Sequence, residues 1–206
     1  MLTPELTTAY INILREELIP ATGCTEPIAI AYAAAKLRET LGQVPEKILA
    51  EVSGNIIKNV KSVIVPNTGG LKGIRAAIAA GVVAGETDQI LQVISRVPQE
   101  AHADIARYTQ DTPIDIVCAN TPRLLDICLT GWAGDHSALV HIANSHSNIV
   151  RIEKDGQVLM EKPLTDSSED SLTDKSLLTV ADILAVADTV DLSLVSELID
   201  RQIDYN

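Results

Sequence analysis

The hydrophobic residues of the chain recur at helical spacing near its start and mainly at strand spacing further along. A first helix is predicted before Pro20, because Thr3-Pro4-Glu5 supplies an N-cap, a first-turn proline and a first-turn acid. A second helix is predicted from an N-cap at Thr25 to a closing glycine at Gly42. The apolar residues of the first helix are Leu6, Tyr10, Ile13, Leu14 and Leu18.

Two short segments then alternate apolar and polar residues, which is the pattern of a strand with one buried face. They are residues 47–53 and 60–65, and the turn-prone Ser53-Gly54-Asn55 lies between them. A glycine-rich loop over residues 66–73 leads into an alanine-rich helix over residues 74–84. Two further helices are predicted over residues 90–97 and from Pro98 to about Tyr108.

The following part of the chain is predicted to be mostly strands. A strand over residues 114–119 precedes an antiparallel run in which Asp155-Gly156 is a strong two-residue hairpin signal. The strands of this run are predicted at residues 124–130, 138–143, 148–154 and 157–162. Two helices are predicted after them, over residues 180–187 and 193–205, and Thr179 is the expected N-cap of the first.

These elements predict an α/β (α+β) fold with a mainly antiparallel sheet, helices packed on it, and a helical pair at the N-terminus. Residues 1–165 are expected to form an α/β domain that carries the cysteine turn and the Asn-Thr-Gly loop. Residues 166–178 are acidic and serine-rich, so we expect a linker or loop there. Residues 179–206 are expected to be C-terminal helices that lead into a further, cluster-binding half of the protein.

Composition narrows the classes of partner. The 206 residues carry a formal net charge of −12, which repels nucleic acid and anionic lipid. Aromatic residues make up only 2% of the chain, so stacking on nucleobases is not expected. The sequence shows no signal peptide and no apolar run of the ~18 residues that a membrane helix needs. We therefore predict a cytoplasmic protein with no nucleic-acid or membrane partner.

Cys24 lies in the turn between the first two predicted helices, at the mouth of a helix N-terminus. The free amide groups and partial positive charge of such a terminus favour a thiolate, which can act as a base, a nucleophile or a metal ligand. The carboxylate of Glu26 opposes thiolate formation. The alternative is a small buried cysteine that packs where the two helices meet.

The glycine-rich loop that contains Asn67 can present backbone N–H groups to an anion such as a substrate carboxylate, and Lys72 and Arg75 would add positive charge. It matches neither the Walker loop nor the GxGxxG motif, and an ordinary tight turn is the alternative. His102, on a predicted helix, is assigned no chemistry.

The other histidines and cysteines do not form a metal-binding pattern. His136, His141 and His146 are at odd spacings, which place neighbours on opposite faces of a strand, so a zinc site is not favoured. His146 lies in a run of five polar residues between apolar strands. This pattern is typical of a functional site or of a loop. Cys118 and Cys128 lie in predicted strands among apolar residues and are interpreted as core residues.

Four segments resemble the L-cysteine desulfidase family, which is also described as the serine dehydratase alpha-chain-like family. They are Ile19-Pro20-Ala21-Thr22-Gly23-Cys24-Thr25-Glu26-Pro27, Gly54-Asn55-Ile56-Ile57-Lys58-Asn59-Val60, Val65-Pro66-Asn67-Thr68-Gly69-Gly70 and Ser145-His146-Ser147-Asn148-Ile149-Val150-Arg151. The resemblance runs in order along essentially the whole chain. It covers only the N-terminal half of that family, whose members are about twice as long.

The resemblance implies an iron–sulfur lyase that converts L-cysteine to pyruvate, hydrogen sulfide and ammonia, or the related L-serine dehydratase. The full-length protein would hold a 4Fe-4S cluster whose ligands lie mostly outside this chain, so we expect no metal site and no activity in the chain alone. Cys24 would be the catalytic base or a thiol that faces the cluster. The residues implied to bind the amino-acid substrate are Asn55, Asn59, Asn67, Thr68, Gly69 and His146.

Two alternatives belong to other functional classes. The chain can be a stand-alone amino-acid-binding or regulatory domain in which Cys24 is structural. It can also be an assembly module whose apolar helices and strands are buried against a second subunit, as in a homo-oligomer, or against the missing C-terminal half.

Overall fold

The computed structural model describes residues 3–164 and 173–205, which form two compact units. One unit is continuous, Ala21–Asp166, and the other combines Met1–Pro20 with Ser167–Asn206. The predicted division at residues 165 and 179 remains a prediction, and residues 166–172 of the predicted linker lie outside the described residues.

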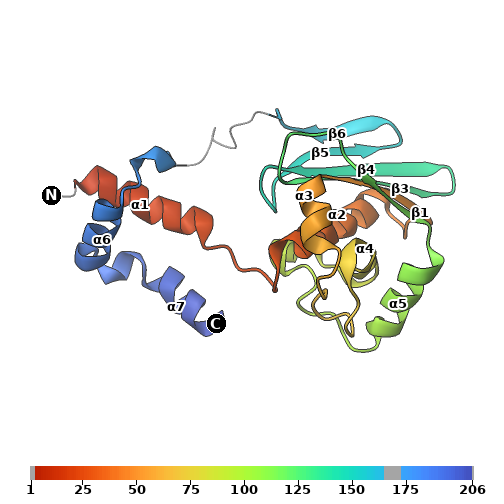
Figure 1. Cartoon of the computed structure of the whole chain (residues 1–206), viewed down its shortest axis with the longest axis horizontal. Coiled ribbons are helices and arrows are strands. Elements are labelled where there is room, and N and C mark those ends of the chain that lie inside the picture. Colours follow the sequence, from red (N-terminus) through yellow and green to blue (C-terminus); the bar gives the residue numbers. More distant parts are fainter. Residues whose placement is uncertain (1–2, 165–172, 206) are drawn as a thin grey trace. The chain divides into compact units, whose positions relative to one another are not determined.

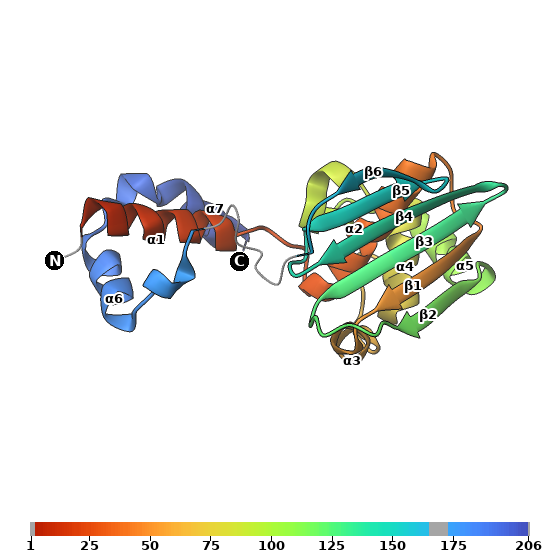
Figure 2. The same ribbon diagram turned by 90° about the horizontal axis from the view of Figure 1, so that it is seen from above.

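The Ala21–Asp166 unit has a six-stranded sheet in the order β2-β1-β3-β4-β5-β6. Figures 1 and 2 show the helices of this unit gathered on one face of the sheet, while the other face carries no helix of the unit. β1 pairs in parallel with β2, and every other neighbouring pair is antiparallel. The predicted mainly antiparallel α/β fold is thus confirmed. The strands are β1 (Lys47–Val52), β2 (Ile114–Cys118), β3 (Asp126–Ala133), β4 (His136–Ala143), β5 (Ile149–Lys154) and β6 (Gln157–Glu161).

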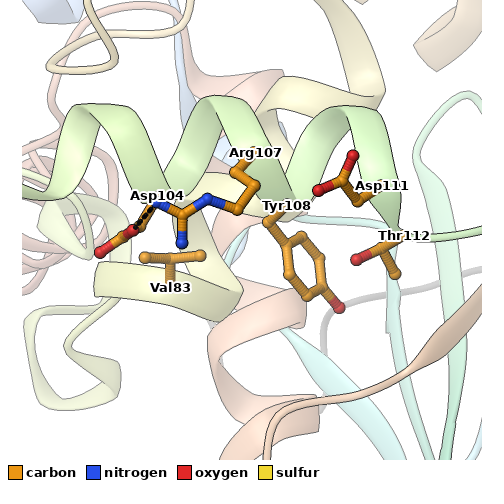
Figure 3. A pocket seen from close by; sticks show the side chains of 6 residues that line it. All are labelled: Val83, Asp104, Arg107, Tyr108, Asp111 and Thr112. Carbon is orange, nitrogen blue, oxygen red and sulfur yellow. Dashed lines mark ion pairs between the residues drawn. The ribbon is translucent and has the colours of Figure 1, made fainter.

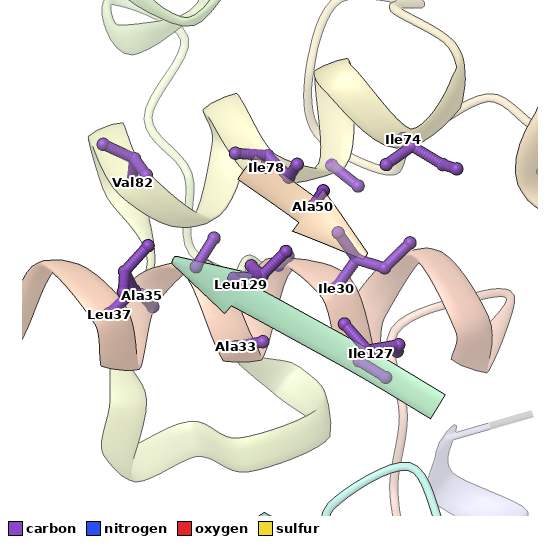
Figure 4. Close-up of a cluster of buried hydrophobic side chains, with 14 of the residues drawn as sticks. Ile30, Ala33, Ala35, Leu37, Ala50, Ile74, Ile78, Val82, Ile127 and Leu129 are labelled. Carbon is purple, nitrogen blue, oxygen red and sulfur yellow. The ribbon is translucent and has the colours of Figure 1, made fainter. Parts of the chain in front are cut away.

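The core lies between the sheet and two apolar helices, α2 (Thr25–Leu41) and α4 (Gly73–Ala84). A Cβ atom at Gly81 would lie 2.1 Å from the backbone oxygen of Ala31, so only glycine permits this close approach of α2 and α4. Because the chain has no Phe, aliphatic side chains fill the core. Figure 4 shows them, including Ile30, Ala33, Leu37, Ala50, Ile74, Ile78, Val82, Ile127 and Leu129.

Three predictions in the middle of the chain are wrong. Residues 54–60, interpreted as a turn and a strand start, form helix α3 (Gly54–Val60), because the buried Ser53 hydroxyl caps it by accepting from the Ile56 N–H at 3.4 Å. Residues 60–65 form no strand. The predicted helix over residues 90–97 is instead a 3-10 turn, η1 (Thr87–Gln92), and α5 (Ala101–Asp111) follows it.

Other boundaries agree closely with the sequence. Thr3 caps α1 (Pro4–Glu17), and Gly42 closes α2 in the left-handed conformation. The N-cap of α2 is Cys24 rather than Thr25, one residue earlier than predicted. Asp155 and Gly156 both have positive φ and connect β5 to β6, as the hairpin signal predicted.

The second unit contains α1, α6 (Val180–Thr189) and α7 (Ser196–Tyr205), with two short turns, η2 (Lys175–Leu177) and η3 (Leu192–Leu194). The Tyr10 hydroxyl joins its two chain segments, donating to the Leu177 carbonyl at 3.1 Å and accepting from the Thr179 N–H at 3.0 Å. Thr179 is the N-cap of α6, as predicted. Among the described residues, no helix has the length and apolar character needed to cross a membrane.

Candidate functional site

Cys24 lies where the sequence predicted it, at the first turn of the 17-residue helix α2. Its side chain is exposed and makes no capping hydrogen bond. The preceding Gly23 has φ +78°, and a Cβ atom there would lie 2.9 Å from Cγ of Pro66. This contact places the cysteine turn directly against the start of the Asn67 loop.

Glu26, in the first turn of α2, connects Cys24 to α3. The side-chain amide of Asn59 donates to Oε1 of Glu26 at 3.2 Å. Asn55 and Asn59 are four residues apart in α3 and therefore lie on the same face of that helix. The sequence predicted the two asparagines as site residues but not Glu26, whose place at a helix start beside Cys24 was the available signal.

His146 extends this cluster from the other half of the unit. It lies between β4 and β5 and is half-buried. Burial lowers the pKa of His146, while the charge of Glu26 acts in the opposite direction. The fold therefore brings three separate segments together around Glu26. We call Cys24, Glu26, Asn59 and His146 the Cys24 cluster.

The Asn67 loop is held mainly by its own side chains. Asn67 has φ +55°, and its amide donates to the backbone oxygens of Ile94 at 3.0 Å and Ser95 at 3.2 Å. Thr68 is buried, and its hydroxyl donates to the Val65 carbonyl at 2.7 Å. These hydrogen bonds fix the loop, so the described contacts of Thr68 are structural.

His102, to which the sequence gave no role, lies against this loop. A Cβ atom at Gly69 would be 3.3 Å from Nδ1 of His102, which is in the first turn of α5. The sequence gave no signal for this contact, because a lone histidine on a helix does not indicate what it faces.

A second group of polar residues lies on the sheet face opposite the helices. Nε2 of His141 and Oδ1 of Asp126 are 2.8 Å apart, and Thr121 donates to Oδ2 of Asp126 at 3.1 Å. Arg123 approaches the same carboxylate at 3.8 Å. Cys128 is directly opposite His141 in the pairing of β3 with β4. We call Asp126, Cys128 and His141, with Thr121 and Arg123, the Asp126 cluster.

Electrostatics distinguish this cluster from a reactive site. Burial raises the pKa of the Cys128 thiol to about 12, and the charges of Glu51, Asp126 and Glu153 act in the same direction. Burial also raises the pKa of Asp126, but the hydrogen bond and charge of His141, the Thr121 hydroxyl and the Arg123 charge outweigh it, so the net shift is downward. The cluster therefore pairs a protonated thiol with an ionised carboxylate.

The interpretation of Cys118 and Cys128 as core residues is wrong for both. Cys118, at the end of β2, is exposed, and its Sγ lies 3.8 Å from where a Cβ atom of Gly54 would be. Cys128 is half-buried and faces away from the helices. Apolar neighbours in sequence did not distinguish the buried face of the sheet from the open one.

A hollow of about 370 Å³ lies elsewhere, beside α5. Figure 3 shows Val83 and five α5 or adjacent residues around it, with Asp104 and Arg107 joined in an ion pair of 3.0 Å. Tyr108 donates from its hydroxyl to the Pro45 carbonyl at 2.7 Å. The hollow contains no predicted site residue, and Asp104, Arg107 and Tyr108 already have partners.

The described residues contain no group of three or more His, Cys, Asp or Glu side chains arranged to hold a metal ion. The three cysteines lie in different elements: the cap of α2, the end of β2 and the middle of β3. The described residues of this chain therefore do not provide a ligand set for an iron–sulfur cluster.

Comparisons with known proteins give three informative relatives, all named UPF0597 proteins. The relative from Desulfitobacterium hafniense is 51% identical over 197 residues, which is 96% of this chain and 46% of the relative. The relatives from Treponema denticola and Lachnoclostridium phytofermentans are 46% and 44% identical, over 96% and 95% of this chain. No family model matches the chain, and no solved structure matches it.

These relatives contradict the resemblance to L-cysteine desulfidases. Their name designates a family of uncharacterised proteins and refers to no lyase, iron–sulfur protein or enzyme of cysteine catabolism. The predictions of family, lyase activity and function that depended on the resemblance were therefore wrong. The name also gives no support to the alternative of a stand-alone binding or assembly domain. The four short motifs were too limited a basis for an activity.

The relatives also place the chain in a longer context. Each of the three relatives has more than half of its own length outside the match. The chain is thus similar to UPF0597 proteins over nearly all of its residues, and it spans about half the length of the curated relatives it matches.

Proposed function

We propose that the Ala21–Asp166 unit provides a longer protein with a binding site for a small zwitterionic molecule, of the free amino-acid class, at the Cys24 cluster. One observation carries the proposal. The carboxylate of Glu26 interacts with Asn59 from α3 and with His146 from the loop between β4 and β5, beside the exposed Cys24 thiol. Polar groups from three segments that are distant in sequence are thus near the Glu26 carboxylate.

Glu26 is the group suited to the ligand's ammonium. Asn59 donates to one of its oxygens, Oε1, and an ammonium group donates readily to a carboxylate. Burial favours the neutral form of His146, whose ring can then accept a hydrogen bond through one nitrogen. The ring makes no hydrogen bond to another residue within the ranges 3–164 and 173–205.

The ligand's carboxylate would be attracted by the neighbouring segment. Between Val52 and Glu86 the sequence contains no Asp or Glu, although the whole chain has a net charge of −12. A Cβ atom at Gly73 would lie 3.3 Å from the Lys61 backbone oxygen, so the end of α3 and the start of α4 are adjacent. The basic residues of this segment are exposed and form no ion pair with another described residue: Lys58, Lys61, Lys72 and Arg75.

The Gly23 and Pro66 contact brings this basic segment next to Cys24. A zwitterion bound with its ammonium at Glu26 and its carboxylate toward the Asn67 loop would lie across the cysteine turn. Cys24 would then face the ligand with a side chain that caps no helix and is free to contact it.

Isothermal titration calorimetry with L-serine tests the proposal, with succinate and ethanolamine as probes that lack the amine or the carboxylate. We expect the chain to bind L-serine more tightly than either probe. Glu26→Gln removes the charge that pairs with the ammonium, so affinity should fall about 10- to 100-fold, as expected for a charge-assisted hydrogen bond.

Asp115→Asn is the matched control, because Asp115 is an exposed carboxylate on β2 that contributes nothing to the cluster. Binding by this variant should equal that of the parent. If the parent does not bind L-serine, or if Glu26→Gln binds it as tightly as the parent, the proposal fails.

A further inference from the structure

The second unit has an unusual distribution of hydrophobic residues. Its described residues bury few apolar side chains, namely Tyr10, Ile11, Ile13, Val186 and Val195. More large apolar side chains of the same unit are exposed, among them Val180, Ile183, Leu184, Leu192, Leu194, Ile199 and Ile203. Single exposed apolar residues are ordinary, but this number in three short helices indicates a surface that another polypeptide covers.

Along α6, the spacing of the exposed apolar residues places them on one continuous surface. Val180, Ile183, Leu184 and Ala187 lie at the i, i+3, i+4, i+7 positions that form one stripe of a helix, and all four are exposed. Val180 is 76% exposed and Leu184 61%. Val186, which borders this stripe on the helix surface, is buried in the small core. One face of α6 thus packs within the unit and the other has no partner among the described residues.

α7 repeats the pattern without any buried residue. Ile199 and Ile203 are four residues apart on one face, among the charged residues Glu197, Asp200 and Asp204. Ile203 is 68% exposed, and Leu192, in the η3 turn before α7, is 73% exposed. A helix this short is marginal in water without tertiary packing of its apolar face. We call the exposed residues of α6, η3 and α7 the α6–α7 surface.

We propose that the α6–α7 surface is the docking site for the polypeptide region that UPF0597 relatives have and this chain does not match. The match covers 46% of the D. hafniense relative, so the unmatched part is as large as a whole domain. A domain of that size can cover two helices, whereas this unit has too few buried residues to form a core of its own. The inference does not depend on the amino-acid site.

Co-purification tests the proposal directly. The region of the D. hafniense relative outside the match is expressed with a tag, together with the full 206-residue chain, and the complex is quantified by sedimentation velocity. The chain should bind the region. Val180→Ser/Leu184→Ser/Ile203→Ser should weaken that binding at least about 100-fold, because three apolar side chains leave the interface.

Val158→Ser/Leu159→Ser is the matched control. It replaces two exposed apolar residues of β6, in the other unit, and should bind like the parent. The matched part of the relative serves as the positive control for the complex. Far-UV circular dichroism and the melting temperature of the triple variant should equal those of the parent, because the replaced side chains are exposed.

Four results would overturn the proposal. The region fails to bind the chain, or it binds the triple variant as tightly as the parent. Alternatively, the chain alone forms a dimer that the triple substitution dissociates, in which case a second copy is the occupant. A triple variant that melts well below the parent would show instead that the surface is buried within the chain itself.

Discussion

The Cys24 cluster and the Asp126 cluster contain the same kinds of group, a thiol, an imidazole and a carboxylate, but they differ in how many of these groups have partners. In the Asp126 cluster, Asp126 is only 5% exposed and both its oxygens have partners, from His141, Thr121 and Arg123. In the Cys24 cluster, the Glu26 carboxylate accepts one hydrogen bond from the part of the chain that the structure describes, from Asn59 at 3.2 Å.

The difference separates a structural cluster from one that can receive a ligand. Buried polar groups must be hydrogen-bonded, and a satisfied set has little to offer a new molecule. The thiol of Cys128 is kept protonated by burial, whereas Cys24 is exposed at a helix start. Identical residue types therefore predict different roles once their partners are known.

Thiol labelling should give the largest contrast between the clusters. Maleimides react with the thiolate, and a pKa of about 12 leaves Cys128 almost entirely protonated at pH 7.5. In a Cys118→Ser background, Cys24 should react at least about 100-fold faster than Cys128, since raising the pKa of a thiol to about 12 lowers its thiolate fraction by more than that factor. Rates are measured by mass spectrometry of the intact chain, with Cys24→Ser and Cys128→Ser to assign them. Equal labelling rates for Cys24 and Cys128 would contradict the difference in thiol reactivity between the two clusters.

The free energy of unfolding should depend more on the Asp126 cluster than on the Cys24 cluster. Asp126→Ala removes the shared partner of three side chains, so the free energy of unfolding should fall by about 2–4 kcal/mol. Glu26→Ala, which breaks a single hydrogen bond, should cost less than about 1 kcal/mol. Urea denaturation measures both. A larger loss for Glu26→Ala than for Asp126→Ala would contradict the assignment of the structural role to the Asp126 cluster.

The pH dependence of that difference has a definite sign. The pKa of Asp126 is lowered in the folded chain, so its contribution is present above the unfolded value of about 3.9 and is lost as pH falls through the folded pKa. The stability gap between the parent and Asp126→Ala should therefore be wide at pH 7 and shrink in acid. A gap that widens in acid would be inconsistent with a lowered pKa.

The smallest expected effect is electrostatic and lies within the Cys24 cluster. Burial lowers the pKa of His146, and the Glu26 charge partly offsets it, so Glu26→Gln should lower the pKa further. Folding favours the neutral ring of His146. The protonation of this side chain should therefore reduce the stability of the protein as the pH falls below the ordinary pKa of histidine. Ring NMR signals followed against pH measure the shift, with Asp115→Asn as control. An unchanged or raised pKa in Glu26→Gln would mean that the two side chains do not interact.

The sequence predicted the elements better than their arrangement. Caps at Thr3 and Thr179, the closing Gly42 and the Asp155-Gly156 hairpin are local signals, and the structure confirms them. Helix α3 was missed because Gly54-Asn55 favours a turn. The helix depends on the cap by Ser53, whose hydroxyl is positioned by donating a hydrogen bond of 2.7 Å to the carbonyl of Leu124, far away in sequence.

For the candidate site, the sequence likewise identified single residues but not their contacts. Cys24 was identified from a local pattern and Asn59 from the family resemblance, but the position of Glu26 near both Asn59 and His146 depends on contacts across the fold. Thr68 resembled a ligand-binding residue, and its hydroxyl instead holds the Val65 carbonyl. Local sequence patterns cannot predict hydrogen bonds between residues that are far apart in sequence.

An NMR titration of the isotope-labelled chain with L-serine tests the role of the Cys24 cluster most directly. Saturable shifts of the backbone amides of Thr25 and Glu26, of the Asn59 side-chain amide and of the His146 ring are predicted, with the signals of Asp126, Cys128 and His141 unmoved. Shifts confined to the Asp126 cluster, or none at either cluster, would contradict the proposal that the Cys24 cluster is the ligand site.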